Sequence, residues 1–248
     1  MPRFFMHLGY CGARFHGWQI QPHDNSVQQT IEEALATILR HSAPIVGAGR
    51  TDAGVNARHM VAHFDIDASD AYCEDPQMLV GKLNALVGKD IVIYRIERVA
   101  DDAHARFDAK SRTYRYYALE EKSPFFHQLA WKASRGLDYE AMNRAAAMLL
   151  DTDDFTSFAK LHSDAKTNIC RVTHAQWHRC DEPGVWYFEI TADRFLRNMV
   201  RAVVGTLVEV GRGKLDIDGF AEVIRKADRC SAGTSMPAHA LYLWNVEY

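Results

Sequence analysis

Residues 172–210 read VTHAQWHRCDEPGVWYFEITADRFLRNMVRAVVGTLVEV. Two β-rich segments, Val172–Arg179 and Val185–Ala192, are predicted strands, because each alternates or is rich in branched and aromatic residues. From Phe195 to Val210 the apolar residues recur at helical spacing, which predicts an amphipathic helix. Two strands followed by a helix, without the strict βαβ rhythm of a parallel sheet, indicate an α+β fold.

The same mixture of elements extends over the rest of the chain. Strands are expected at Phe4–Tyr10, Val61–Ile66, Ile91–Val99, Arg112–Leu119 and Leu241–Tyr248, and helices after Ser26, after Asp75, at Tyr139–Leu150 and at Ile217–Lys226. Ser26 and Gln29 have the spacing of a capping box. The elements divide into two similar α+β halves, and we expect the subdomains to be residues 1–107 and 108–248.

Composition excludes several classes of protein. Of the 248 residues, 48% are hydrophobic and 25% are charged, which is globular usage rather than that of a disordered chain or a coiled coil. No apolar run approaches the ~18 residues of a membrane helix, and the N-terminus turns polar too soon for a signal peptide. Five cysteines without a C-x-x-C pair argue against a disulfide framework or a zinc knuckle, and they predict a cytoplasmic location.

The charges are segregated along the chain, although the net charge is only −3. Residues 65–75 carry five acidic residues and no Lys or Arg, whereas residues 106–115 and 194–214 are basic. The basic residues that we expect to bind a polyanion are Arg106, Lys110, Arg112, Arg194, Arg197 and Lys214. The alternative is that these segments are simply solvated faces.

A glycine-flanked segment, Gly49–Ala57, holds one cation and one carboxylate close together. Arg50 and Asp52 point to the same side if the segment is extended, because side chains alternate along a strand. Functional residues concentrate on such loops, which makes Asp52 a candidate catalytic group. The alternative is a loop salt bridge. The segment is not a phosphate-binding P-loop, because Val55 follows Gly54 where that motif has Lys.

Two further segments combine arginine with aromatic or apolar residues. On a strand, Arg112, Tyr114 and Tyr116 share one face, which can stack a base and neutralise a phosphate. The alternative is that the tyrosines of this segment are core residues. Arg194, Arg197 and Arg201 are spaced at i, i+3 and i+7, and we expect them to form one stripe beside the apolar face of the helix predicted from Phe195 to Val210. The alternative is a solvated stripe.

His59 and His63 are four residues apart, but they lack the H-E-x-x-H pattern of a zinc helix, and the segment alternates like a strand. We therefore expect structural histidines there. His104, His162 and His174 follow no recognisable ligand spacing.

Several motifs together resemble one known family. They include FHGWQ at 15–19, GRTDAGV at 49–55, HARF at 104–107, RTYRY at 112–116, DFTSF at 154–158, RFLRNMVR at 194–201, GTL at 205–207, VGRGK at 210–214 and LYL at 241–243. In this order and spacing they resemble the tRNA pseudouridine synthases of the TruA type, which isomerise uridine in the anticodon stem-loop of tRNA.

The resemblance implies specific roles. Asp52 is the catalytic aspartate, and Arg50 assists in extruding the target base. Tyr114 stacks on the uracil, Arg201 pairs with the aspartate and Leu241 forms an apolar wall. The implied fold is a mixed, mostly antiparallel sheet shared by the two subdomains, with the active-site cleft between them. The implied enzyme is a homodimer that modifies tRNA positions 38–40 and uses no metal and no cofactor.

The chain departs from the usual family pattern at Cys11, Asn56, Met236 and Ala240. We expect Asn56 and Met236 to alter RNA contacts or pocket shape. Two other functions stay open from the residues alone: a catalytically inactive RNA-binding protein of the same fold, and a hydrolase that uses a lone Asp with a nearby His as base. Three mechanisms also stay open, because Asp52 can attack the base, attack C1′ or take a proton from the sugar.

Overall fold

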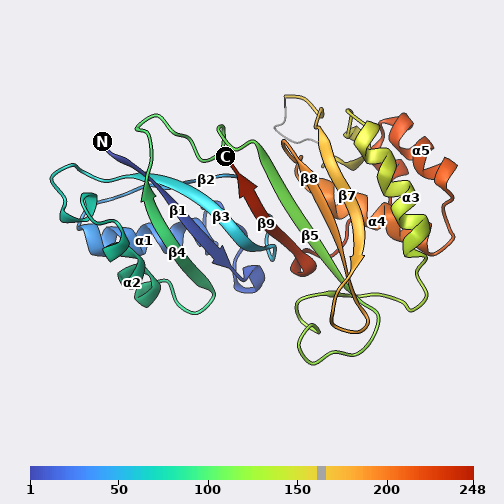
Figure 1. Cartoon of the computed structure of the whole chain (residues 1–248), viewed down its shortest axis with the longest axis horizontal. Helices are drawn as coiled ribbons and strands as arrows, with labels where there is room; N and C mark the ends of the chain where they lie inside the picture. Colours follow the sequence, from blue (N-terminus) through green and yellow to red (C-terminus); the bar gives the residue numbers. More distant parts are fainter. Residues whose placement is uncertain (161–165) are drawn as a thin grey trace. The chain divides into compact units, whose positions relative to one another are not determined.

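The computed structural model describes residues 1–160 and 166–248, and His162 lies outside these ranges. The chain forms two compact units, which we call unit 1 and unit 2. Unit 1 contains Met1–Lys110 and Leu243–Tyr248, and unit 2 contains Ser111–Tyr242. Both units combine a sheet with helices, so the predicted α+β class is confirmed (Figure 1). The subdomain boundary expected at 107/108 stays a prediction, because compactness does not test whether each part folds alone.

The sheet of unit 1 is built around β1 (Arg3–Tyr10). This strand pairs antiparallel with β3 (Asn56–Asp65) on one side and with β4 (Ile91–Arg98) on the other. The two-residue strand β2 (Val46–Gly47) pairs with β3, and β9 (Leu241–Glu247) comes next to β3 in the strand order.

The helices of unit 1 are α1 (Val27–Leu39) and α2 (Gln77–Leu86), and α2 packs against α1 and β4. Apolar side chains at helical spacing on α1 and at alternate positions on β1 are fully buried, and they form the core of unit 1. These residues include Phe4, Met6, Leu8, Ile31 and Leu35. Burial of this apolar surface is the main force that stabilises the unit.

The sheet of unit 2 has β8 (Val185–Ala192) between β5 (Ser111–Leu119) and β7 (Val172–Arg179), and all three strands are antiparallel. A short strand, β6 (Trp131–Lys132), pairs parallel with β5. Helices α3 (Tyr139–Ala147), α4 (Met199–Gly211) and α5 (Ile217–Lys226) pack together, and α3 also packs against β7. The fully buried residues of this sheet, Tyr116, Trp177, Phe188 and Ile190, form the core of unit 2.

Six short 3-10 helices complete the described chain. They are η1 (Gly12–Arg14), η2 (Ala71–Cys73), η3 (Met148–Asp151), η4 (Thr156–Phe158), η5 (Arg229–Ser231) and η6 (Ala238–Ala240). Within the described ranges, none of the helices has both the length and the apolar character that crossing a membrane requires.

Most predicted elements are confirmed, and the bounds of β7, β8 and α5 are those expected. The helix expected from Phe195 is wrong at its start, because α4 begins only at Met199. Asn198, with φ of 68°, adopts the left-handed conformation, which asparagine tolerates and which cannot continue a right-handed helix. Arg194 and Arg197 therefore lie before the helix, and only Arg201 of the expected stripe belongs to it.

Of the two hydrogen bonds predicted for the capping box at α1, one is confirmed. Ser26 Oγ accepts a hydrogen bond from the Gln29 amide at 3.2 Å, as expected. The Gln29 side chain instead donates to Glu33 Oε1 at 2.9 Å. The helix ends one residue before Arg40, whose φ of 64° gives it a left-handed C-cap.

Candidate active site

The candidate carboxylate, Asp52, lies in unit 1 on the loop between β2 and β3. Thr51 before it is buried, Asp52 is half-buried and Arg50 is exposed. The Val55 amide donates to the Asp52 carbonyl at 3.1 Å and closes a tight turn, in which Gly54 has φ of 79°. Asp52 is therefore the first residue of a tight turn whose positive φ at position 54 favours glycine.

Residues 12–18 hold this loop from one side through the backbone. The Trp18 amide donates to the Thr51 carbonyl at 3.2 Å, and the Gly54 amide donates to the Phe15 carbonyl at 3.3 Å. Gly17 has φ of 99°, and a Cβ added there would come within 2.5 Å of the Thr51 oxygen. The approach is thus close enough to require glycine, and it fixes the main chain on either side of Asp52.

Two buried polar side chains complete the support of the loop. Thr51 Oγ1 and Tyr10 OH are 2.9 Å apart, so the loop is hydrogen-bonded to the end of β1. Asn56 is buried, and its Oδ1 accepts from the Gly12 amide at 2.9 Å. This hydrogen bond joins the start of β3, directly after the Asp52 loop, to η1. The expectation that Asn56 alters RNA contacts or pocket shape stays a prediction.

Tyr114, the candidate stacking residue, lies on β5 in unit 2. It pairs with Ile190 of β8, and only 9% of its surface is exposed. Its ring meets Phe195 edge-on, with 4.9 Å between centroids and 80° between planes. Phe195 therefore restricts the orientation of the Tyr114 ring, as edge-to-face aromatic pairs do.

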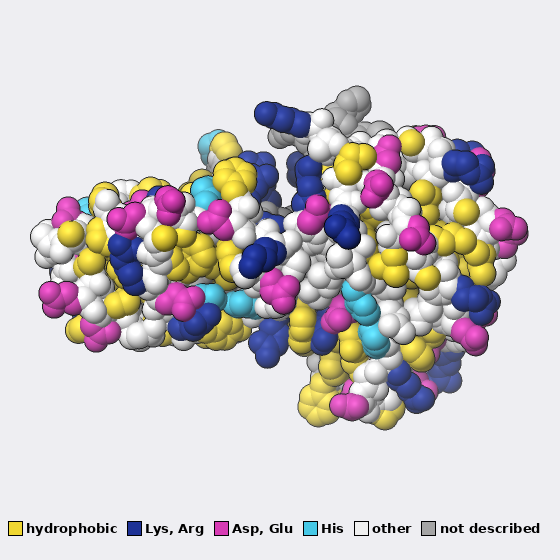
Figure 2. Space-filling view, turned by 45° about the horizontal axis from the view of Figure 1, so that its top comes forward, with side chains coloured by type: hydrophobic (Ala, Val, Ile, Leu, Met, Phe, Trp, Pro, Cys, Tyr) yellow, Lys and Arg dark blue, Asp and Glu magenta, His cyan; other side chains and the backbone are white. Residues whose placement is uncertain are grey.

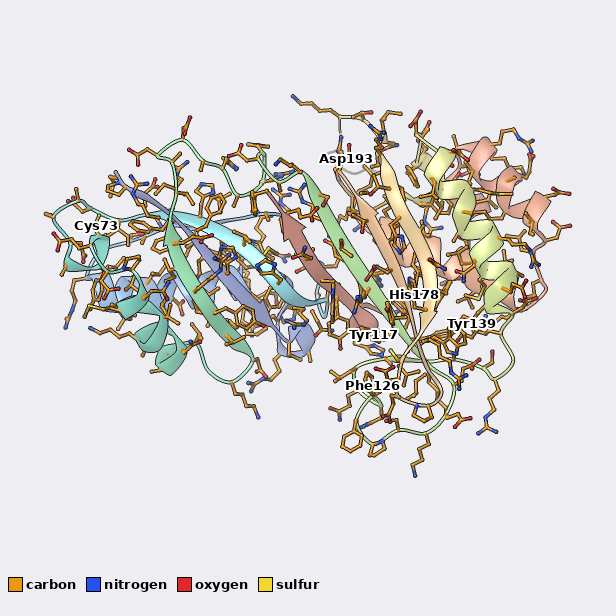
Figure 3. The ribbon with its side chains drawn as sticks, in the orientation of Figure 1. Cys73, Tyr117, Phe126, Tyr139, His178 and Asp193 are labelled. Carbon is orange, nitrogen blue, oxygen red and sulfur yellow. The ribbon has the colours of Figure 1, made fainter. Side chains whose placement is uncertain are left out.

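The neighbouring residues of β5 have different roles. Tyr116 is fully buried, so the alternative of a core tyrosine is confirmed for it. Tyr117, on the opposite face, packs with Tyr242 and other aromatic side chains. Arg112 Nη1 donates to the Asp193 carbonyl at 2.9 Å, and this hydrogen bond connects β5 to the segment after β8 (Asp193 is labelled in Figure 3).

Arg201, the candidate active-site cation, lies in the first turn of α4. Its Nε donates to the Met236 carbonyl at 2.5 Å, and the Met236 amide donates back to the Arg201 carbonyl at 3.1 Å. The next carbonyl, that of Pro237, accepts from Tyr116 OH at 3.1 Å. Burial raises the pKa of Tyr116, and the charge of Arg201 offsets part of this effect. The phenol therefore stays neutral and can donate.

The segment that Arg201 contacts is packed closely on α4. A Cβ at Gly205 would lie 1.9 Å from the Thr234 oxygen, so only glycine allows this approach. Ser235 Oγ is bound by the side chains of Asn198 at 2.5 Å and Arg229 at 2.8 Å. Leu241, the candidate apolar wall, follows η6 and is buried. These contacts give residues 234–237 a fixed position beside Arg201.

The candidate RNA-binding residues belong to both units. Arg106 and Lys110 are exposed residues of unit 1, whereas Arg112, Arg194, Arg197 and Lys214 belong to unit 2. Lys214 follows α4 and Arg197 precedes it, so the length of the helix, about 20 Å, separates them. On the face drawn in Figure 2, Lys and Arg side chains are interspersed with Asp and Glu.

The expectation of structural histidines on β3 is confirmed. His59 Nε2 and His7 Nδ1 are 2.9 Å apart, and the other ring nitrogen of His59 lies 2.8 Å from Asn245 Oδ1. His63 is buried, and its Nδ1 accepts from the Ala105 amide at 3.1 Å. Burial is the main cause that lowers the pKa of His63 to about 4, and the positive charge of Arg3 lowers it further.

The motifs and the family resemblance predict roles for Asp52, Tyr114 and Arg201, and these roles stay predictions. The residues that hold these three side chains were not predicted. Gly12 and Gly17 were the available signal, because glycine is the residue that permits a positive φ or a close backbone approach. Asn198 gave no comparable signal.

The sequence is similar to a known family of enzymes. A sequence model of the family described as tRNA pseudouridine synthase matches residues 145–248. Three relatives named tRNA pseudouridine synthase A match over 100% of this chain. The proteins of Parabacteroides distasonis, Porphyromonas gingivalis and Bacteroides thetaiotaomicron are 58%, 57% and 55% identical, with 96%, 98% and 91% of their own lengths covered.

The chain belongs to the tRNA pseudouridine synthase A family. It is an isomerase that converts uridine to pseudouridine in tRNA.

Proposed function

We propose that Asp52 carries out the isomerisation and that the target uridines lie in the anticodon stem-loop of tRNA, at positions 38–40. The role of Asp52 is supported by the contacts that Tyr10 and residues 12–18 make with the Asp52 loop and with Asn56 directly after it. We call this set of contacts the loop cradle. Gly17 contacts the carbonyl before Asp52 so closely that no other residue fits, and Asn56, which follows the loop as the first residue of β3, is hydrogen-bonded to η1. Catalytic groups gain from such fixed positions, because a misplaced group loses rate steeply.

The reaction requires little beyond a positioned carboxylate and a held base. The N1–C1′ bond breaks, the C5–C1′ bond forms, and the hydrogen on C5 is exchanged for one on N1. Substrate and product are isomers, so no electron acceptor enters the balance. Three roles fit an ionised Asp52: attack on the base, attack on C1′ or removal of a sugar proton.

The other candidate residues would act on the base during this rearrangement. Tyr114 would stack on the uracil with a ring orientation set by Phe195, and Leu241 would close the apolar side of the pocket. Arg201 would pair with Asp52, and the hydrogen bond from Arg201 to the Met236 carbonyl would hold the guanidinium in position. Arg50 would assist in extruding the uridine, a step that costs a few kcal/mol of unstacking.

A set of tRNA transcripts tests the proposed substrate. Each uridine at positions 38, 39 and 40 is replaced by cytidine, singly and together, and pseudouridine is measured by mass spectrometry of nuclease digests. We expect the triple replacement to abolish the product and single replacements to remove only the altered position. Pseudouridine elsewhere in the triply replaced tRNA would contradict the anticodon stem-loop assignment. Binding of every transcript without any product would favour the inactive RNA-binding protein.

We also propose that the enzyme works in the cytoplasm as a homodimer on which one tRNA contacts both chains. The family resemblance supports this assembly. Light scattering on the purified protein tests it directly, with twice the mass of one chain expected and a monomer at all concentrations contradicting it.

A further inference from the structure

One face of the unit 2 sheet carries polar and titratable side chains instead of core residues. Alternate residues of β8, Phe188 and Ile190, are fully buried. Glu189 between them projects to the other face, because side chains alternate along a strand. His174 and His178 on β7 lie on this same face and are half-buried. Histidine side chains are visible at the surface in Figure 2, and His178 is labelled on β7 in Figure 3.

The strand register brings these three side chains together. Glu189 is directly opposite Gln176, so His174 and His178 stand two residues to either side of its partner position. Both imidazoles lean toward the carboxylate. Their rings are nearly parallel, with 13° between planes and 5.7 Å between centroids, although four residues separate them on the strand. One nitrogen from each ring and one carboxylate oxygen all lie within 4.8 Å of one another.

In the part of the chain that the structure describes, one nitrogen of this cluster lacks a hydrogen-bond partner. His174 Nε2 is buried, and no hydrogen-bond partner for it is found among the described residues. The nearest acid, Glu189 Oε1, is 3.7 Å away, which is too long for a hydrogen bond. A buried ring nitrogen without a partner is unfavourable, and a bound cation would remove that cost.

Surrounding side chains hold two of the donors in place. Arg115 Nε donates to Glu189 Oε2 at 2.5 Å, which orients the carboxylate and leaves Oε1 directed toward His174. The guanidinium of Arg115 lies 4.4 Å from the centre of the Tyr187 ring. Tyr187 in turn stacks on His178, with 5.1 Å between centroids. Metal ligands in proteins are commonly oriented by such outer contacts.

We propose that His174, His178 and Glu189 form a binding site for a divalent transition-metal ion of the zinc class. Two imidazoles with one carboxylate suit Zn²⁺, Ni²⁺ or Cu²⁺ better than Mg²⁺ or Ca²⁺, which prefer oxygen ligands. Ligand bonds of about 2 Å in a tetrahedral site place the donor atoms about 3.3 Å apart, so a pair of donors 4.8 Å apart would have to close by about 1.5 Å. Three protein ligands leave a fourth position for water. None of the three residues is among those proposed for isomerisation.

Titration of untagged wild-type protein with Zn²⁺ and with Co²⁺ tests the site. Calorimetry should show one Zn²⁺ per chain, and Co²⁺ should give the visible absorption of a low-symmetry site. The variants His174→Gln, His178→Gln and Glu189→Gln should each bind Zn²⁺ at least about tenfold more weakly. His127→Gln is the matched control, because His127 is an exposed histidine of the same unit that lies outside the cluster.

The outcomes separate clearly. Tenfold or greater weakening in the three variants, with unchanged binding in the control, establishes the site. Absence of Zn²⁺ binding to the wild-type protein would overturn the proposal, and so would binding that all three variants retain. Circular dichroism of each variant confirms that the fold is intact, and pseudouridine formation is measured separately, so that failure of either proposal is recognised on its own.

Discussion

Single residues in this protein owe their chemistry to burial and to a few close contacts. His63 on β3 is the clearest case, because its imidazole is buried, accepts a hydrogen bond from the Ala105 amide and has a pKa lowered by burial from the ordinary 6.5 to about 4. A neutral histidine in the folded state becomes a source of acid sensitivity, since the unfolded chain binds the proton more readily.

The sign of this pH effect follows directly. The contribution of His63 to stability is fully present above its unfolded pKa of about 6.5 and is lost as the pH falls toward 4. We expect about 1–2 kcal/mol of the stability lost between pH 7.5 and pH 5 to come from this residue. His63→Asn keeps an acceptor for the Ala105 amide and cannot titrate. Urea unfolding at both pH values should therefore show a smaller pH dependence for the variant, and an identical dependence would refute the assignment.

Tyr114 gives a second prediction at the residue scale. Loss of a base-stacking ring costs about 1–3 kcal/mol, which corresponds to a rate loss of roughly 5- to 150-fold for Tyr114→Ala. Tyr114→Phe keeps the ring against Phe195 and should retain stacking, so its rate reports on the hydroxyl alone. Single-turnover rates at saturating tRNA measure the effect, and thermal melts show whether each variant folds. A folded Tyr114→Ala protein with a wild-type rate would make Tyr114 a core residue only.

Helices and strands could be predicted where the local sequence pattern determines them, but not where a contact between distant residues does. The alternation and helical spacing of local sequence were sufficient for β7, β8 and α5. They failed at the start of α4, because Asn198 adopts a left-handed conformation, with its side chain hydrogen-bonded to Ser235 far away in the sequence. The Asp52 loop was recognised by its motif, whereas its cradle requires approaches between residues far apart in sequence. The His174 cluster was missed for the same reason, since it depends on cross-strand register.

The loop cradle makes a prediction about position rather than chemistry. Gly17→Ala should strain a backbone at φ of 99° and push the Thr51 carbonyl away, because the new Cβ would lie 2.5 Å from it. We expect the rate to fall by at least about tenfold, while tRNA binding changes little. Gly81→Ala on α2 is the control, since no described atom lies within 4 Å of its added Cβ and the helix tolerates alanine. A wild-type rate for Gly17→Ala would show that the cradle does not position Asp52.

At the scale of the whole molecule, tRNA binding must succeed despite a net charge of −3. Local basic residues can do this, because each neutralised phosphate releases counterions and makes affinity depend on salt. Lys214 is suited to such a contact, since its side chain is 65% exposed and only loosely paired with Glu209 at 3.5 Å. Arg197 is also exposed.

Salt titrations separate RNA-binding cations from solvated ones. Lys214→Ala or Arg197→Ala should weaken tRNA binding and reduce the slope of log affinity against log salt by about 0.7–0.9, the value of one contact. Lys226→Ala, an exposed cation at the end of α5, should leave both unchanged. Arg201→Ala should instead lower the single-turnover rate at saturating tRNA. If the first two variants bind like wild type at every salt concentration, these residues belong to a solvated surface.

The most direct measurement is pseudouridine formation by Asp52→Asn, which keeps the size of the side chain and removes its charge. We predict no detectable product in a single-turnover assay, with tRNA affinity and thermal stability close to those of wild type. Asp102→Asn, which changes an exposed carboxylate of the same unit, should react at the wild-type rate. Substantial pseudouridine formation by Asp52→Asn would contradict the catalytic assignment of Asp52.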